Sequence, residues 1–240
     1  MSTLFISDLH LSQERPEITG LFLTFLQRHA VKAEAVYILG DLFEVWLGDD
    51  MILPDYQPAI EQIHTLVNNG IAVYIMYGNR DFLMREQFEN LSRATLIHEP
   101  HVIDLYGTKT LLMHGDTLCT DDIEYQKFRV MVRNRQWQDE MLARPPAERQ
   151  ALAKKFREIS KTETAQKENE IMDVNQDAVI QTLRDNKVTN LIHGHTHRPD
   201  THRFKLDGAT ATRIVLADWY KTGSYLSVDD NSYVTHQVNL

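Results

Sequence analysis

Three histidines occupy alternate positions in the stretch LIHGHTHR, residues 191–198, at the end of a short apolar run. Successive side chains of a strand point to opposite faces, so an extended chain would place His193, His195 and His197 on one side. Gly194 lies between two of them and permits a bend or a close approach of the backbone. Such a group either packs in the core or holds a ligand, and the rest of the chain has to distinguish these two interpretations.

Polar clusters also follow four other short, β-rich runs. TLFI, AVYIL, AVYIMY and TKTLLM lead into SDLH, GD, GNRD and HGD, as NLI leads into the histidine cluster. The early runs are separated by EITGLFLTFLQRHA and YQPAIEQIHTLVNNG, which are apolar at helical spacing, so we expect right-handed crossovers and a parallel sheet. The later runs TRIVLADWY, SYLSVDD and SYVTHQVNL predict antiparallel strands joined by short turns. We therefore expect an α/β fold with two sheets packed as a sandwich.

The polar clusters are expected to meet, because ligands of open parallel sheets collect beyond the carboxyl ends of the strands. Seven side chains would converge: Asp8, His10, Asp41, Asn79, His114, His195 and His197. Carboxylate and amide oxygens mixed with imidazoles, without a thiolate, suit manganese, iron or zinc. Seven ligands exceed the usual number for one ion, so two ions that share one carboxylate are expected, with Asp41 as the bridge. Paired metal ions of this kind promote displacement at phosphorus.

The composition indicates an ordinary soluble globular protein, since 42% of the 240 residues are hydrophobic and 25% are charged. A net charge of −9 argues against broad nonspecific binding of nucleic acid. Cys119 is the only cysteine, so an internal disulfide is excluded and a reducing compartment is expected. The first residues do not form a signal peptide, and no window approaches the roughly 18 apolar residues that cross a bilayer.

A helical block without a β-like run, residues 124–170, interrupts the alternating pattern. It contains 11 Lys and Arg against 8 Asp and Glu, whereas the remainder has 14 against 26. We expect a single domain over residues 1–240 with this block inserted as a helical cap. A basic insertion on an acidic body favours a cap that binds an anionic substrate, and a solvated helical hairpin without a chemical role is the alternative.

The blocks DLH, GDLFE, GNRD, HGD and GHTH, in this order, resemble the signature of the calcineurin-like metallophosphoesterases. This resemblance covers residues 8–198 and implies a β-sandwich flanked by helices. A closer resemblance rests on ISDLHLS, YILGDLFEVWLGDD, GNRDFL, MHGDTLCTDD, IMDVNQ and LIHGHTHRP. These segments are similar to those of the UDP-2,3-diacylglucosamine hydrolases, the pyrophosphatases of lipid A biosynthesis, which also carry a helical insertion.

That resemblance implies hydrolysis of UDP-2,3-diacylglucosamine to UMP and 2,3-diacylglucosamine 1-phosphate (lipid X), with two manganese ions per chain. A hydroxide bridging the ions would attack the uridine-side phosphorus. One ion is implied at Asp8, His10, Asp41 and His197, and the other at Asp41, Asn79, His114 and His195. The implied substrate contacts are Asn79, Arg80, Asp122, Ser160, Lys167 and His195, and the implied catalytic residues are Asp41, Asn79, Arg80 and His195.

Several side chains near these blocks have two interpretations. Arg80 either forks onto phosphate oxygens or forms a surface ion pair with Asp81. Asp81 and Asp116 are expected to orient histidines, or else to cap turns. Thr164 stands where the family commonly has an asparagine that contacts substrate, so that contact is open. Six apolar residues either line an acyl pocket or simply pack helices: Trp46, Phe128, Met131, Trp137, Leu152 and Phe156.

The implied substrate also bears on location and on the alternatives. Because it carries two acyl chains, we expect a cytoplasmic protein in peripheral contact with the inner membrane. A diadenosine polyphosphate hydrolase or a nuclease of the same superfamily would keep the metal site and change the substrate. A noncatalytic scaffold of the same fold would be expected to lack several of the seven ligands.

Overall fold

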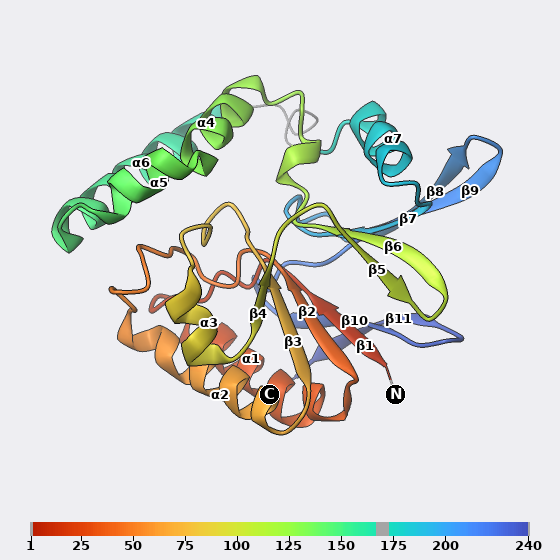
Figure 1. The fold of residues 1–240 in the computed structure, drawn as a ribbon, viewed down its shortest axis with the longest axis horizontal. Coiled ribbons are helices and arrows are strands. Elements are labelled where there is room, and N and C mark those ends of the chain that lie inside the picture. Colours follow the sequence, from red (N-terminus) through yellow and green to blue (C-terminus); the bar gives the residue numbers. More distant parts are fainter. Residues whose placement is uncertain (1, 167–172, 240) are drawn as a thin grey trace.

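The computed structural model describes residues 2–166 and 173–239, and the side chains of these residues except at 159–166. Within this part of the chain, two sheets face each other and helices cover the outer face of each (Figure 1). The α/β sandwich expected from the sequence is therefore confirmed.

The first sheet has the strand order β11-β10-β1-β2-β3-β4. Its strands are β1 (Thr3–Ile6), β2 (Ala35–Leu39), β3 (Ala72–Met76), β4 (Thr95–Ile97), β10 (Gly223–Val228) and β11 (Tyr233–Val238). Strands β1 to β4 are parallel, and β10 and β11 form an antiparallel hairpin at the edge beside β1. The connections contain α1 (Pro16–Arg28), η1 (Ala30–Lys32), η2 (Pro54–Tyr56), α2 (Gln57–Asn68) and α3 (Glu86–Ser92).

The second sheet has the order β5-β6-β7-β9-β8. Its strands are β5 (His101–Leu105), β6 (Thr108–Met113), β7 (Asn190–His193), β8 (Asp200–Leu206) and β9 (Ala209–Val215). The sequence placed TRIVLADWY in one antiparallel series with the last two strands, and this is wrong. Strand β9 ends at Val215 and pairs with β7 and β8. Residues 216–222 then leave the second sheet, and Trp219 among them is buried. The chain then crosses to the first sheet.

Alternate side chains of the central strands enter two different cores. Leu4 and Ile6 of β1 pack toward the helices with Phe22 of α1, while Phe5 packs between the sheets with Ile192 of β7. Both faces of these strands are thus buried, which explains why they appear as continuous apolar runs. A third cluster joins the second sheet to α7 (Gln176–Asp185), giving four layers.

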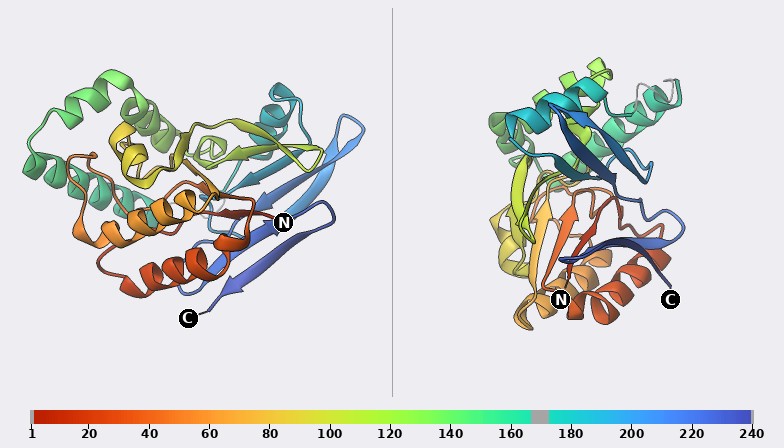
Figure 2. Two further views of the ribbon diagram at one scale, coloured as in Figure 1. Left: turned by 60° about the horizontal axis from the view of Figure 1, so that its bottom comes forward. Right: turned by 90° about the vertical axis from the view of Figure 1, so that its right-hand side faces the viewer.

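The helical block forms three helices, α4 (Ile123–Arg133), α5 (Arg135–Leu142) and α6 (Pro146–Gln166), with the short η3 (Asp116–Leu118) before them. The chain bends at Asn134, whose extended backbone ends α4 and whose side chain accepts from Trp137 N to cap α5. The three helices lie over the end of the first sheet where β1, β2 and β3 terminate (Figures 1 and 2). Among the described helices, none combines the length and the apolar character needed to cross a bilayer.

Candidate metal centre

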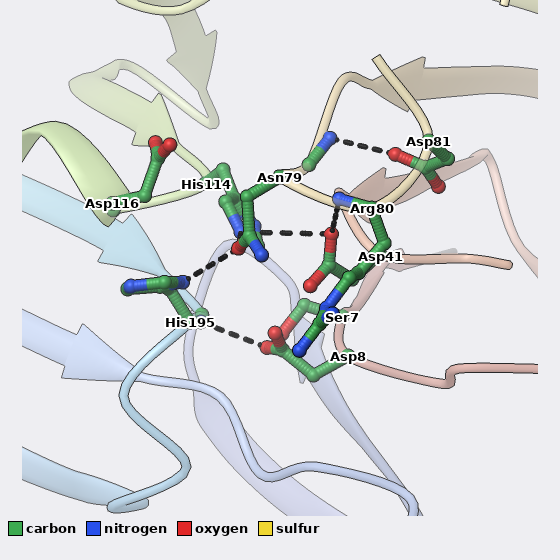
Figure 3. Close-up of polar contacts among 12 residues, drawn as sticks. Ser7, Asp8, Asp41, Asn79, Arg80, Asp81, His114, Asp116 and His195 are labelled. Atoms are coloured by element: carbon green, nitrogen blue, oxygen red, sulfur yellow. Dashed lines mark hydrogen bonds and ion pairs between the residues drawn. The ribbon is translucent and has the colours of Figure 1, made fainter. Parts of the chain in front are cut away.

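Five strands end just before the polar clusters that the sequence singled out. The seven side chains come from the ends of β1 (Asp8, His10), β2 (Asp41), β3 (Asn79), β6 (His114) and β7 (His195, His197). Three of these strands belong to the first sheet and two to the second. The site therefore lies at the seam between the sheets, and the structure brings all seven residues together. Figure 3 labels five of them, Asp8, Asp41, Asn79, His114 and His195.

A first group of ligand atoms comes from Asp8, His10 and His197, whose atoms all lie within 4.8 Å of one another. His197 Nε2 is 3.5 Å from Asp8 Oδ1, and His10 Nε2 is 3.7 Å from Asp41 Oδ2. With Asp41, these are the four residues that the resemblance assigned to one ion.

A second group contains Asp41 and His114, with Asp41 Oδ1 3.8 Å from His114 Nε2. Asn79 Oδ1 lies 2.9 Å from both His114 Nε2 and His195 Nδ1, so these four residues face one point. Asp8 also falls within 4.8 Å of this group, which the resemblance had not indicated. The two oxygens of Asp41 face different groups, the arrangement required of a shared carboxylate.

The backbone at the site is unusual, because five of the seven residues adopt positive φ. The values are 56° at Asp8, 50° at His10, 52° at Asp41, 68° at His195 and 54° at His197. Residues other than glycine rarely occupy this region, and each costs about 1–3 kcal/mol where the fold enforces it. Such strain clusters at functional sites and here aims the side chains inward.

The expectation that three histidines share one face is wrong. Strand β7 ends at His193, and the positive φ at His195 and His197 breaks the alternation. His193 is fully buried, with Nε2 3.2 Å from Arg213 Nη1, and burial followed by the Arg213 charge lowers its pKa to about 3. His193 is therefore a neutral packed residue, while the other two histidines belong to different ligand groups.

Two glycines are required by close approach. A Cβ at Gly78 would collide with Asp41 Oδ1, and one at Gly194 would collide with Asp8 Oδ2. The ligand loops can pack around the two carboxylates only because these positions carry no side chain.

The charges at the site fit a bound cation. Asp8 Oδ1 and both ring nitrogens of His10 are buried without a hydrogen bond among the described residues. Burial would lower the pKa of His114, but the carboxylates of Asp41 and Asp8 outweigh it and raise the pKa to about 9. Burial would raise the pKa of Asp8, yet the contact with His197 and the other nearby imidazoles hold it well below its usual range. These side chains together favour positive charge, as a metal site does.

Asp81 and Asp116 do not orient histidines, contrary to the sequence-based expectation. Asp81 accepts from the backbone N–H groups of Leu42, Phe43 and Gly78 and so fastens two ligand loops together. It is fully buried and forms no ion pair with Arg80 among the described residues. Asp116 accepts from Tyr125 Oη at 2.7 Å and from Arg129 Nε at 2.8 Å.

Sequence reasoning missed several residues that contact the ligands. Glu44 Oε2 is 3.1 Å from His10 Nδ1, and Asp218 Oδ2 is 3.8 Å from His197 Nδ1. The Tyr125 ring stacks on His195, with centroids 5.9 Å apart. Of these residues, only Glu44 could have been identified from the sequence, because it is an acidic residue within the block GDLFE. Tyr125 and Asp218 belong to segments outside the polar clusters.

A cavity of about 470 Å³ lies between this site and the cap. Asn79, Arg80 and Asp122 line it on the polar side. Trp46, Phe128, Met131, Trp137 and Phe156 also line it, as one interpretation of these apolar residues predicted, whereas Leu152 packs against the helix-facing core.

The remaining predicted substrate contacts are placed less fully. Asp122 also caps α4 by accepting from Tyr125 N. Ser160 and Thr164 belong to helix α6, but the structure does not describe their side chains. Lys167 lies outside the described residues.

Comparison with known proteins places the chain in a family. The calcineurin-like phosphoesterase family matches residues 1–199. A UDP-2,3-diacylglucosamine hydrolase from Marinobacter nauticus is 47% identical, covering 98% of this chain and 96% of the relative. The hydrolase of the same name from Hahella chejuensis is 48% identical, covering 97% and 96%.

Solved structures agree with the fold. An archaeal phosphodiesterase superposes with a TM-score of 0.50 at 13% identity, covering 99% of this chain and all of the other. Vacuolar protein sorting 29 from Cryptosporidium parvum gives 0.50 at 15% identity, covering 100% and 91%. At these identities the likeness shows the fold alone. The sequence matches show that the chain belongs to the calcineurin-like phosphoesterases and, within them, to the UDP-2,3-diacylglucosamine hydrolase family.

Proposed function

We propose that the protein hydrolyses the pyrophosphate bond of UDP-2,3-diacylglucosamine to give UMP and 2,3-diacylglucosamine 1-phosphate in lipid A biosynthesis. The name shared by the relatives supports this substrate. We further propose one domain over residues 1–240 with residues 124–170 as its cap, and two manganese ions as cofactor.

The observation that carries the proposal is that the ligand cluster and the apolar cavity meet. Asn79 contacts His114 and His195 on the metal side, and it also lines the cavity beside Arg80. The far wall of the cavity is aromatic and aliphatic, from Phe128 and Phe156 of the cap. A molecule with a pyrophosphate at one end and acyl chains at the other matches a space that is polar at Asn79 and Arg80 and has an apolar wall elsewhere.

The residues have separable roles in this reaction. Asp8, His10, Asp41 and His197 would hold one metal ion, and Asp41, Asn79, His114 and His195 the other. Bound divalent ions polarise phosphoryl oxygens and lower the pKa of water that they coordinate.

The chain's own residues then orient the substrate. The Arg80 backbone N–H donates to Asp41 Oδ1 at 2.8 Å, which fixes the start of that side chain beside the bridge. Because Arg80 lines the cavity, we propose that its guanidinium binds phosphate oxygens as a fork. His195, which is partly buried beside the Tyr125 ring, has a pKa lowered to about 4 by burial and then by the nearby His114 charge. As a ligand it would bind through a neutral ring nitrogen.

A lipid substrate must be collected from a membrane surface, so we propose peripheral contact with the cytoplasmic face of the inner membrane. The cap supports this, because it exposes Ile123, Val130 and Met131 on α4. Asp122, Ser160 and Lys167 are proposed to contact the substrate from the cap side.

The test is to incubate purified protein, stripped of metal and reloaded with Mn²⁺, with UDP-2,3-diacylglucosamine. We expect equimolar UMP and 2,3-diacylglucosamine 1-phosphate, and neither product in the presence of EDTA. Diadenosine tetraphosphate under the same conditions is the matched comparison. Its turnover together with inertness toward the lipid nucleotide would favour the alternative diadenosine polyphosphate hydrolase.

A further inference from the structure

Glu44 lies between a proposed metal ligand and the cap. It follows the bridge Asp41 by three positions, in the loop after β2, and its side chain is 18% exposed. Oε2 lies 3.1 Å from His10 Nδ1, and Oε1 accepts from Arg157 Nη2 of α6 at 2.6 Å. One carboxylate thus contacts the core site with one oxygen and the cap with the other.

The orientation of His10 makes this contact informative. Its Nε2 faces the ligand cluster, 3.7 Å from Asp41 Oδ2, while Nδ1 faces Glu44. A histidine that binds metal through one nitrogen usually donates the other N–H to a carboxylate or carbonyl, which fixes its tautomer and its ring. Glu44 Oε2 stands where such an acceptor would lie, 3.1 Å from Nδ1.

One other proposed ligand shares the pattern, and a second has a carboxylate on the same side of its ring. His114 turns Nε2 to the cluster and places Nδ1 2.9 Å from the Leu39 carbonyl oxygen. His197 turns Nε2 to Asp8 and places Nδ1 3.8 Å from Asp218. In each of these rings, Nδ1 faces an oxygen atom on the side away from the ligand cluster. For His10 that oxygen belongs to Glu44.

We propose that Glu44 is a positioning residue that holds His10 in its metal-binding orientation, and that Arg157 restrains Glu44 from the cap. An ordinary surface ion pair would leave the second carboxylate oxygen in solvent, whereas here it faces an imidazole whose side chain is only 10% exposed. The inference rests on the metal site of the proposed function, and it adds a path by which the cap contacts that site.

The experiment measures Mn²⁺ affinity by titration calorimetry without substrate, so that it does not depend on turnover. Glu44→Ala is expected to weaken binding by about 10- to 100-fold. Glu44→Gln should lose less, about 3- to 10-fold, because the amide oxygen still accepts from Nδ1–H. In the Glu44→Ala variant, excess Mn²⁺ should restore most of kcat in the hydrolase assay, because the defect is in occupancy.

Arg157 provides a graded comparison. Arg157→Ala is expected to weaken Mn²⁺ binding up to about fivefold, since the ion pair is partly exposed, and Arg157→Lys should recover part of the loss. The matched control is Arg184→Ala, which breaks an exposed 2.7 Å ion pair with Asp207 on another face of the protein. It should bind Mn²⁺ as the wild type does.

Wild-type Mn²⁺ affinity in a folded Glu44→Ala variant would overturn the inference. If that variant does not fold, Glu44→Gln decides, and wild-type affinity there overturns the inference equally. A wild-type protein that binds Mn²⁺ tightly but does not hydrolyse UDP-2,3-diacylglucosamine would refute the proposed substrate and leave the result on Glu44 standing.

Discussion

Among the single residues of the site, Asp41 occupies the most demanding position. Its Oδ1 is 3.8 Å from His114 Nε2 and its Oδ2 is 3.7 Å from His10 Nε2. It is 2% exposed and has positive φ, so the fold enforces both its burial and its direction. A residue in this place serves both ligand groups, whereas Asn79 serves one.

Replacing Asp41 by Ala is therefore expected to abolish hydrolysis and to reduce metal content more than Asn79→Ala does. The measurement is metal per chain after dialysis against a fixed Mn²⁺ concentration, with circular dichroism as the check of folding. Retention of two ions per chain by Asp41→Ala would contradict the role of bridge.

Arg80 gives a second residue-scale prediction. Arg80→Ala removes a charge-assisted contact with phosphate and keeps the backbone hydrogen bond to Asp41, so turnover should fall roughly 10- to 150-fold, or about 1.5–3 kcal/mol. Metal content should stay normal. Lys167→Ala is expected to act in the same direction.

The control for Arg80 is Arg144→Ala on the cap, whose partner is Glu148 at 3.5 Å and which does not line the cavity. Unchanged steady-state kinetics in both Arg80→Ala and Lys167→Ala would remove the argument that these residues bind the substrate.

At the residue scale, the seven ligand candidates could be identified from the sequence because their types and their places after apolar runs are local features. The direction of each side chain could not. Five positive φ values turn the chain against its ordinary preference, and only the surrounding fold can enforce them. For the same reason His193 looked like a third member of its cluster although it pairs with Arg213.

Among the elements, α4 fastens the cap to the ligand loops. Arg129 donates from Nη2 to Glu99 Oε1 at 2.7 Å and from Nε to Asp116 Oδ2 at 2.8 Å. Glu99 Oε2 in turn accepts from His114 N at 2.9 Å, and Arg133 Nη2 donates to the Gly78 carbonyl oxygen at 2.8 Å. The cap helix therefore contacts loops of both sheets.

Arg129→Ala should destabilise the fold strongly, because it leaves two buried carboxylates without their counter-charge. A loss of about 3 kcal/mol in the free energy of unfolding is expected from a broken buried pair. Urea unfolding with EDTA present measures it without a contribution from metal. Arg135→Ala, which breaks an exposed pair with Asp139 on the same cap, should leave the midpoint unchanged.

The stability that Arg129→Ala loses should depend on pH in a defined direction. Burial and then the Asp116 charge raise the pKa of Glu99 from 4.5 to about 7 in the folded protein. A carboxyl group with a raised folded pKa loses stability as pH rises from its unfolded value through its folded value. Without the Arg129 charge this loss of stability becomes larger. Arg129→Ala should therefore lower the free energy of unfolding more at pH 8 than at pH 5. An equal cost at both values would show that Glu99 is not the group involved.

The elements with strong local patterns could be predicted, and those without them could not. Strands β1, β2 and β3 and helices α1 and α2 appear where apolar runs and helical spacing indicated them. Strands β5 and β8 were missed because only one of their faces is covered, so burial alternates along HVIDL and DTHRFKL and neither contains a continuous apolar run.

In the whole molecule, the division between core and cap defines two ends of one cavity. The ligand groups lie at the seam of the sheets, and the cap contributes the apolar wall. The sequence indicated a basic insertion and two sheets, but it could not assign β9 and β10 to different sheets. That assignment depends on contacts between segments far apart in the chain, which no local pattern contains.

The arrangement of core and cap also predicts which phosphorus is attacked. Attack at either phosphorus of the pyrophosphate gives the same products, UMP and 2,3-diacylglucosamine 1-phosphate, so product identity does not distinguish them. We expect the acyl chains to lie against the cap, so that the lipid phosphate leaves toward the cavity and the uridine-side phosphate lies at Asp41, Asn79 and Arg80. Water that attacks in line then adds to the uridine-side phosphorus.

Hydrolysis in oxygen-18 water should therefore place the heavy isotope in UMP, as measured by mass spectrometry of both products. The control incubates unlabelled UMP and 2,3-diacylglucosamine 1-phosphate with the loaded protein in the same water, and no label should enter either one. Label in the lipid product instead would mean that the substrate lies in the opposite direction. Arg80 would then bind the phosphate attached to glucosamine, and the aromatic wall of Phe128 and Phe156 would have to face the uridine rather than the acyl chains.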